Sequence, residues 1–281
     1  MKEFLNKAWQ NHFAIGAFNI DSFETLKAVS NACQKLNAPV LIEVSPGEVE
    51  FLGMRNLASV VDNIRREFGV PIFINLDHAD NIDNIEKALD FCFDLVHFDG
   101  GKLPIDENIS RAKRVVEMAH RVGAVVEGEI DHFVGSSELH ATASEVPQLT
   151  DPENARRFVE TTGVDIFAVS IGNKHGYYAD GSKKLHLDHL QKIKEVLPDT
   201  YFSLHGGSGA PNEDVQSAIE LGVVKVNINS ELRIAWKTGL MRSLVENARE
   251  YTWSKIVSNP VSDVQKVIEE KIKLFGSNDK I

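Results

Sequence analysis

The stretch PIFINLDH (71–78) has the composition of a buried β-strand and ends in two reactive side chains, Asp77 and His78. Its nearly continuous apolar residues are typical of a strand covered on both faces of a sheet. Seven further runs of the same kind occur along the 281 residues: AIGAFNI (14–20), PVLIEVS (39–45), DLVHFDGG (94–101), AVVEGEID (124–131), IFAVSIGN (166–173), YFSLHGG (201–207) and VKVNINS (224–230).

Amphipathic helical patterns separate these runs. Residues 23–36, for example, place Leu26, Val29 and Cys33 at spacings of three and four. Similar patterns cover 55–67, 82–92, 106–121, 152–161, 186–196 and 212–220. Eight β-then-α units with right-handed crossovers predict a (β/α)₈ TIM barrel. A doubly wound open sheet is the alternative, but AFNIDS (17–22) lacks the glycine-rich phosphate turn expected after its first strand.

No linker interrupts the pattern, so we expect one barrel domain over 1–281. Residues 231–281 exceed what an eighth helix needs and predict extra C-terminal helices, which we interpret as helices for subunit contact. Residues 132–150 run without clear periodicity, and a loop of that length inside a compact domain is usually functional.

The composition limits the classes of partner. A formal net charge of −11 disfavours nucleic acid and anionic membranes. The N-terminus lacks an apolar signal core, and no run has the length of a membrane span. Cys33 and Cys92 lie far apart in helical patterns and are interpreted as small core residues. These features predict a reducing, cytoplasmic location.

Three histidines follow three different strands. In a TIM barrel the functional face lies at the carboxyl ends of the strands, where His78, His175 and His205 would converge. Three neutral imidazoles with an open fourth position form the ligand set of a catalytic zinc. Five other histidines are interpreted as ordinary polar residues: His97, His132, His140, His186 and His189.

Acidic and glycine-rich segments flank these histidines. Asp77 adjoins His78 and is a candidate for acid/base work or for positioning a ligand. Glu127 and Glu129 share one face of their strand; one could hydrogen-bond to a metal ligand from behind, and the other could be a weak or alternative ligand. The glycines and Ser208 after His205, together with Asn227 and Ser230, predict a phosphate site between the last two strands.

The chain resembles the class II ketose-bisphosphate aldolases, which include fructose- and tagatose-bisphosphate aldolases. The resemblance spans essentially the whole sequence through motifs in family order: GAFN (16–19), LDHA (76–79), VEGE (126–129), SIGNKHGYY (170–178), LHGGSG (204–209), KVNINSELR (225–233) and KIKLFGS (271–277).

This resemblance implies zinc-dependent, reversible cleavage of a ketose 1,6-bisphosphate, most simply fructose 1,6-bisphosphate, to dihydroxyacetone phosphate and an aldehyde. Asp77 would be the acid/base, His78, His175 and His205 the zinc ligands, and Glu129 an alternative ligand. A monovalent cation, Na⁺ or K⁺, is implied beside the phosphate. The implied substrate-binding residues are Asn19, Gly176, Gly206, Gly207, Ser208, Asn227, Ile228, Asn229 and Ser230.

The sequence departs from the family in the half of the site that receives the aldehyde end. The loop after the fifth strand reads VGSSE (134–138), with one glycine instead of two, so Glu138 is a candidate enolising base displaced by about one position. Lys255 stands near the place of an arginine that grips the distal phosphate in fructose-specific members.

Several alternatives stay open at this stage. A tagatose-bisphosphate or other ketose-phosphate aldolase is one, and a non-catalytic homologue that binds zinc and a phosphosugar is another. Lys174 leaves an imine mechanism open, whereas a zinc barrel hydrolase is disfavoured by Asn19 at the end of the first strand. The resemblance also implies a homodimer or homotetramer.

Overall fold

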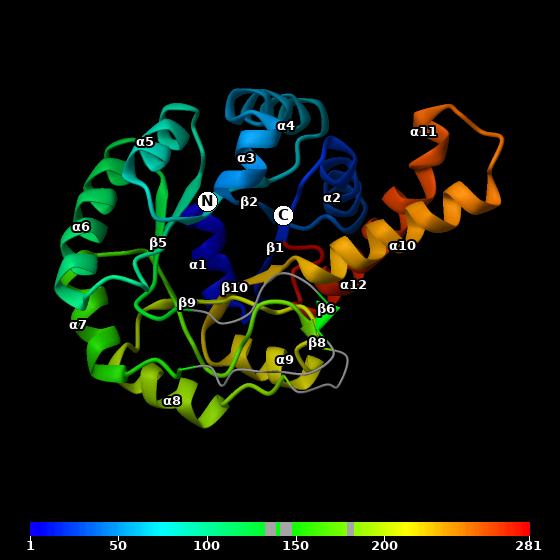
Figure 1. Cartoon of the computed structure of the whole chain (residues 1–281). Coiled ribbons are helices and arrows are strands. Elements are labelled where there is room, and N and C mark those ends of the chain that lie inside the picture. The colour runs from blue at the N-terminus through cyan, green and yellow to red at the C-terminus, as the bar shows by residue number, and fades with distance from the viewer. Residues whose placement is uncertain (133–138, 141–147, 179–182) are drawn as a thin grey trace.

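A computed structural model describes residues 1–132, 139–140, 148–178 and 183–281. Within that part of the chain, eight parallel strands close into a barrel in the order β1-β10-β9-β7-β5-β4-β3-β2, with helices outside it (Figure 1). This arrangement confirms the predicted TIM barrel. The strands are β1 (Ile15–Asn19), β2 (Val40–Val44), β3 (Ile72–Ala79), β4 (Leu95–Phe98), β5 (Val125–Gly128), β7 (Ile166–Ala168), β9 (Tyr201–Leu204) and β10 (Val223–Ile228).

The outer helices follow the predicted periodicity closely. They are α2 (Phe23–Leu36), α4 (Met54–Phe68), α5 (Ile82–Asp90), α6 (Ile105–Arg121), α7 (Pro152–Thr162), α8 (Leu187–Val196), α9 (Asn212–Glu220) and α10 (Ser230–Glu246). Local signals fix several of their ends. Ser22 caps α2 in a reciprocal capping box with Thr25, and Asn37 ends it in the left-handed conformation.

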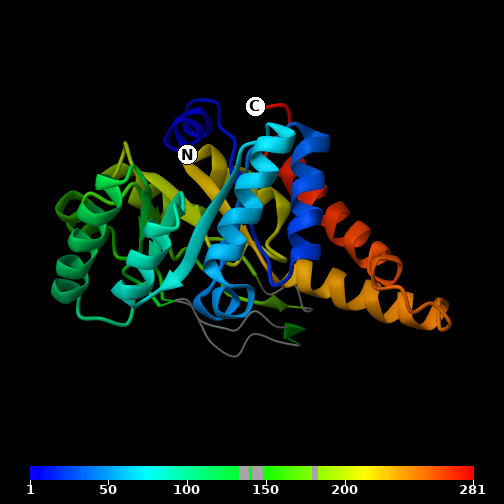
Figure 2. The ribbon, with the colours of Figure 1, turned by 90° about the horizontal axis from the view of Figure 1, so that it is seen from above.

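Two helices add to the predicted pattern at the amino-terminal half. The short α3 (Pro46–Leu52) follows Ser45, which caps it together with Glu48. α1 (Lys2–Gln10) closes the end of the barrel at which the strands begin, because its Leu5 and Ala8 pack against the first inward-facing apolar residues of the strands. Figure 2 shows α1 at the end opposite the small strands β6 (Leu139–His140) and β8 (Tyr177–Tyr178).

Inside the barrel, side chains change from apolar to polar along each strand. Side chains alternate with a period of two, so residues i, i+2 and i+4 face the interior in successive layers. β3 contributes Phe73, then Asn75, then Asp77, and β5 contributes Val125 followed by Glu127. The apolar layer therefore lies against α1, and the polar layers lie toward the mouth.

The C-terminal helices lie beside α2. α10, α11 (Trp253–Ile256) and α12 (Ser258–Leu274) project to one side of the barrel, with α11 farthest from it (Figure 1). Within the described segments, no helix combines the length and apolar character that crossing a bilayer requires.

Candidate active site

The end of β3 carries a local irregularity that turns two consecutive side chains toward the mouth. The pairing of β3 with β4 shifts register between Leu76 and Ala79, and His78 has a φ of +49°. In a regular strand, Asp77 and His78 would point to opposite faces. The left-handed turn of His78, a conformation that histidine adopts more readily than most residues, allows both to reach the pocket.

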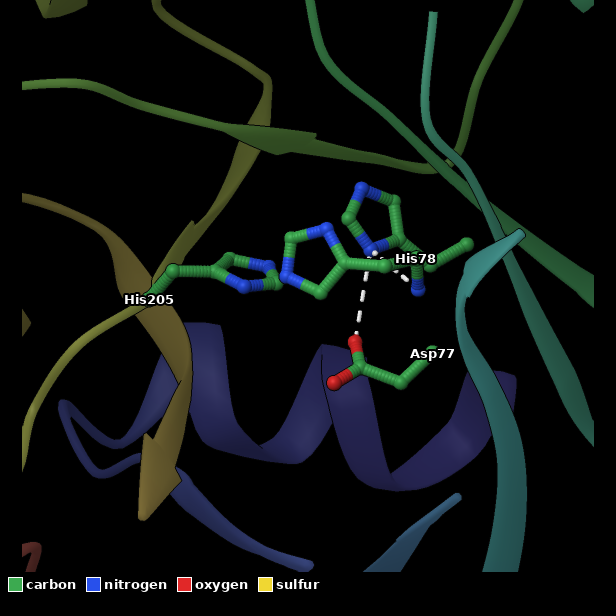
Figure 3. Close-up of side chains that lie close together, drawn as sticks. Asp77, His78 and His205 are labelled. Carbon is green, nitrogen blue, oxygen red and sulfur yellow. Dashed lines mark hydrogen bonds and ion pairs between the residues drawn. The ribbon is translucent and has the colours of Figure 1, made fainter. Parts of the chain in front are cut away.

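The three histidines singled out from the sequence meet at the mouth of the barrel. The ring centroid of His78 lies 4.8 Å from that of His205 and 5.1 Å from that of His175, and the last two centroids are 6.1 Å apart. In Figure 3, Asp77 and His205 approach His78 from the ends of β3 and β9. Side chains more than a hundred positions apart in the sequence thus share one small volume.

Two of these histidines are oriented by carboxylates. Nε2 of His205 lies 2.7 Å from Oε1 of Glu127, and Nδ1 of His78 lies 3.1 Å from Oδ2 of Asp99. Each ring nitrogen donates to its carboxylate, which leaves Nδ1 of His205 and Nε2 of His78 with a lone pair. A carboxylate behind a ligating imidazole is the usual way in which proteins fix the tautomer of a metal ligand.

Burial keeps two of the rings neutral. It lowers the pKa of His205 to about 4, although Glu127 acts in the opposite direction. Burial, reinforced by the neighbouring rings of His78 and His205, also lowers the pKa of His175 well below its usual value. Burial opposes the charged form of His78 too, but Asp77 and Asp99 outweigh it and raise that pKa. Neutral imidazole is the form that binds metal.

Below the histidines lies a buried charged layer centred on Lys225. Its ammonium nitrogen is 2.8 Å from Oε2 of Glu127 and 3.0 Å from Oε1 of Glu43, and all three residues are fully buried. Burial raises the pKa of Glu43 to about 8 despite this lysine. For Glu127, Lys225 and His97 overcome the cost of burial and hold the pKa well below its usual range. Glu127 is therefore the ionised partner of Lys225.

His97 is a site residue that the sequence interpretation missed. It is fully buried, with Nδ1 3.3 Å from Oδ1 of Asp77 and Nε2 3.4 Å from Oε2 of Glu129. Burial lowers its pKa, but Glu127 and Glu129 more than compensate and raise it well above the usual value. The available signal was its spacing of two from Asp99, the residue directly after β4, which places both side chains inside the barrel.

Two overlapping groups of side chains have the geometry of metal ligands. One ligand atom from each of Asp77, His78, His97 and His205 lies within 4.8 Å of the others, and the same holds for His78, Asp99 and Glu129. Neither oxygen of Glu129 receives a hydrogen bond of ordinary length and geometry, although both are buried. The unsatisfied oxygens of Glu129 and the clustered imidazoles suit a cation.

The loops after β7, β9 and β10 border the same volume. Gly206 has a φ of +64°, and a Cβ atom there would lie 2.1 Å from the carbonyl oxygen of Lys174, so only glycine allows these two loops to touch. The hydroxyl oxygen of Ser208 accepts from the amide nitrogen of Asn229 at 3.2 Å, which leaves its proton available for a ligand. The loop after β9 is thereby fixed to the start of α10.

These elements enclose a pocket of about 290 Å³. Of the residues selected from the sequence, it is lined by Asn19, Asp77, His78, Glu129, His175, Gly176, His205, Gly206, Ser208, Asn227, Asn229 and Ser230. Gly207 and Ile228 lie behind the lining, where Gly207 donates its amide to the carbonyl of Asn227 at 3.0 Å. Glu138 lies outside the described residues.

The far side of the pocket differs from the sequence expectation. Lys255 is on α11 and pairs with Glu250 at 2.9 Å, and it does not line the pocket. Arg233 does line it, paired with Glu48 at 2.8 Å. Lys174 is also absent from the described lining, so the structure gives no support to an imine at that residue.

A polar pocket at the carboxyl ends of barrel strands, with clustered imidazoles and carboxylates, defines a barrel enzyme. Comparison with known proteins identifies which one. The family model "Fructose-bisphosphate aldolase class-II" matches residues 1–280. The fructose-bisphosphate aldolase of Streptococcus pneumoniae is 37% identical over 291 aligned positions, covering 99% of this chain and 98% of that protein. The chain belongs to the class II fructose-bisphosphate aldolase family and is an aldolase, a carbon–carbon lyase.

Other relatives agree with this assignment. The fructose-bisphosphate aldolase of Streptococcus pyogenes is 34% identical over 99% of this chain and 98% of that protein. The crystal structure of the YdjI aldolase from Escherichia coli superimposes with a TM-score of 0.84 at 29% identity, covering 99% of this chain and 97% of that one. The fructose-bisphosphate aldolase of Campylobacter jejuni, at 22% identity, shares the fold with a TM-score of 0.86, covering 100% and 95% of the two chains.

Proposed function

We propose that this aldolase is zinc-dependent and reversibly cleaves a ketose 1,6-bisphosphate, with fructose 1,6-bisphosphate the first candidate, to dihydroxyacetone phosphate and glyceraldehyde 3-phosphate. One observation carries the proposal. The rings of His78, His175 and His205 meet at the mouth of the barrel, beside Asp77 and the loop after β9.

The donor set supports zinc. His78 and His205 each donate one ring N–H to a carboxylate, so the second nitrogen carries the lone pair that a metal ligand needs. In His205 this nitrogen, Nδ1, lies 3.5 Å from the amide nitrogen of Asn227, and burial favours neutral His175. Glu129 supplies buried oxygens within reach of His78 as an alternative ligand. When bound, zinc would supply Lewis-acid chemistry, polarising the ketone that is cleaved.

We propose that Asp77 is the acid/base for one hydroxyl group of the substrate, the one on the half that leaves as the aldehyde product. It is buried, and burial opposes its charge, yet His78 and the hydrogen bond with His97 hold its pKa well below the usual value. As a carboxylate at the pocket wall it can accept the hydroxyl proton when the C–C bond breaks and return it in the reverse direction. Glu138 remains our candidate for the proton at the triose carbon.

The phosphate of the triose is proposed to bind between Gly176, the loop of Gly206 and Ser208, and the start of α10. Ser208 offers a hydroxyl, and Asn229 and Ser230 lie at the positive end of a 17-residue helix. Asn227 and Asn19 add amide groups on the pocket wall. Gly207 and Ile228 do not line the pocket, and they would contribute through their main chain, which fixes the shape of the phosphate-binding loops.

The identity of the second product rests on relatives, several of which are named fructose-bisphosphate aldolase. Arg233, rather than Lys255, is the cation near the far side of this pocket. Its planar guanidinium group would bind a second phosphate or a carboxylate once the ion pair with Glu48 is broken. A tagatose bisphosphate, which differs at one carbon, is the alternative substrate.

The test is a cleavage assay on zinc-reconstituted protein with a panel of ketose phosphates. We expect cleavage of fructose 1,6-bisphosphate, its loss on complete chelation and its return with zinc. Activity that survives zinc removal would refute the metal mechanism, and trapping of protein by borohydride would indicate an imine. Binding of dihydroxyacetone phosphate without hydrogen exchange at its carbon would favour a non-catalytic binder.

We further propose a homodimer or homotetramer in the cytoplasm. Apolar side chains exposed on α10 and beyond it support subunit contact, notably Met241, Val245 and Tyr251. Two unpaired cysteines, Cys33 and Cys92, support a reducing compartment. Sedimentation of the purified chain at two concentrations tests the assembly, and a monomer at both would refute it.

A further inference from the structure

Lys183 lies buried beneath the proposed phosphate loops, with 3% of its surface exposed. Its ammonium donates to the main-chain carbonyl oxygens of Gly176 at 2.6 Å and Gly206 at 2.8 Å, and to that of Ser208. An ammonium group has three N–H donors, and all three are used here. The three carbonyls belong to residues that line the pocket.

Carbonyl oxygens converging on one point form the coordination shell that proteins offer to alkali cations. The family resemblance implied Na⁺ or K⁺ beside the phosphate. In this chain the ring of Gly176, Gly206 and Ser208 already holds the ammonium of Lys183. Because the ammonium of Lys183 occupies the centre of these three carbonyls, there is no place for a free Na⁺ or K⁺ among them.

A second buried lysine shows what is unusual about Lys183. Lys225 pairs with the carboxylate of Glu127 at 2.8 Å and lies 3.0 Å from the carboxyl group of Glu43, whereas Lys183 is held by carbonyls. Burial lowers the pKa of Lys183 to about 7, and the negative charge of Glu231 only partly offsets this. Glu231 is itself paired with Lys271 at 2.8 Å. A buried cation of this kind gains most from an anionic ligand in the adjoining pocket.

We propose that Lys183 is the resident cation of the phosphate loops and stands in for a free Na⁺ or K⁺, so that a phosphorylated triose binds without a monovalent ion. This inference rests on the phosphate end of the proposed function. Because its donors are used by carbonyls, Lys183 acts on the phosphate through its charge and through the loop shape that it fixes.

The test measures dihydroxyacetone phosphate binding to zinc-loaded protein by calorimetry. Buffers of equal ionic strength contain tetramethylammonium, which is too large for the ring, or Na⁺, K⁺ or NH₄⁺. We expect wild-type affinity to stay within about twofold across these salts. Lys183→Met keeps the length and loses the charge, and should bind roughly tenfold or more weakly in every salt. Lys184→Met, at the exposed neighbouring lysine, is the matched control and should match wild type.

Lys183→Ala opens the carbonyl ring. We expect weak binding in tetramethylammonium and recovery with K⁺ or NH₄⁺, which a purely structural lysine would not produce. A wild type whose affinity rises about tenfold with Na⁺ or K⁺ would overturn the proposal, as would unchanged binding by Lys183→Met or a folded Lys183→Ala that no cation restores. The wild-type comparison needs no variant, so it decides even if the variants unfold.

The failures are distinguishable from those of the proposed reaction. Salt-independent binding of dihydroxyacetone phosphate by a protein that cleaves no ketose bisphosphate would refute the reaction alone. Cleavage that requires Na⁺ or K⁺ would refute the role of Lys183 alone.

Discussion

Oε1 of Glu127 lies 2.7 Å from Nε2 of His205, in the interior of the barrel where neither side chain meets solvent. The same carboxylate also accepts from the hydroxyl of Ser203 at 2.6 Å and pairs with Lys225. The contacts of Glu127 with Ser203 and Lys225, which lie deeper in the barrel, therefore help to orient His205. The orientation matters because a ligating imidazole must present the correct nitrogen to the metal.

We predict that Glu127→Gln weakens zinc binding by about 10- to 100-fold, because the amide no longer enforces a proton on Nε2 of His205. Competition titration with a chromogenic chelator measures the zinc affinity. Glu117→Gln, on the exposed face of α6, is the control and should bind zinc as wild type does. Equal affinity in the two variants would contradict the role assigned to Glu127.

The ion pair below this histidine predicts a stability effect. Lys225→Met leaves the charge of Glu127 buried without its cation, and should lower the free energy of unfolding by about 3–5 kcal/mol. Denaturation in urea measures this. Because burial raises the pKa of Glu43 whereas that of Glu127 is held well below its usual range, adding Glu127→Gln should recover more stability than adding Glu43→Gln. If Glu43→Gln recovered more stability than Glu127→Gln, Glu43 would be the ionised partner of Lys225 instead.

Much of the barrel could be predicted because its strands are continuous apolar runs and each intervening helix has its own periodicity. α1 was not predicted, because a helix that closes the barrel is stabilised by contacts with residues distant in sequence, such as Phe73 and Val224.

The site could be predicted less completely. Residues at strand ends, such as His78 and His205, follow from topology alone. His97 was missed because its spacing from Asp99 indicates only that it faces the barrel interior, and not that Asp77 and Glu129 lie against it. The left-handed φ of His78, which turns it beside Asp77, is likewise invisible in a sequence that reads as regular strand.

The carboxylate of Asp77 gives a catalytic prediction. Asp77→Asn removes the group that would move the hydroxyl proton, and cleavage should fall by about 10²- to 10⁴-fold. Zinc content should stay close to wild type, because His78, His175 and His205 are unchanged. Asp80→Asn, just beyond β3 and exposed, is the control with full activity. Steady-state cleavage together with bound zinc separates a lost proton transfer from a lost metal, and full activity of Asp77→Asn would refute the assignment.

Gly206 offers a prediction with a closely matched control. Gly69 has the same φ, +64°, yet a Cβ atom there would meet nothing within 4 Å, whereas at Gly206 it would lie 2.1 Å from the Lys174 carbonyl. Gly69→Ala should therefore cost only the strain of a left-handed alanine, about 1 kcal/mol. Gly206→Ala should cost roughly 1–3 kcal/mol more, because the loops after β7 and β9 must separate.

The same substitution should also weaken the triose phosphate site, because Gly206 supplies one of the carbonyls around Lys183 and lines the pocket. Urea denaturation of both variants gives the stability difference, and calorimetry with dihydroxyacetone phosphate gives the affinity. Gly69→Ala should bind as wild type does. If Gly206→Ala matched Gly69→Ala in both measurements, the contact between the two loops would be dispensable, and phosphate binding would have to depend on the start of α10 instead.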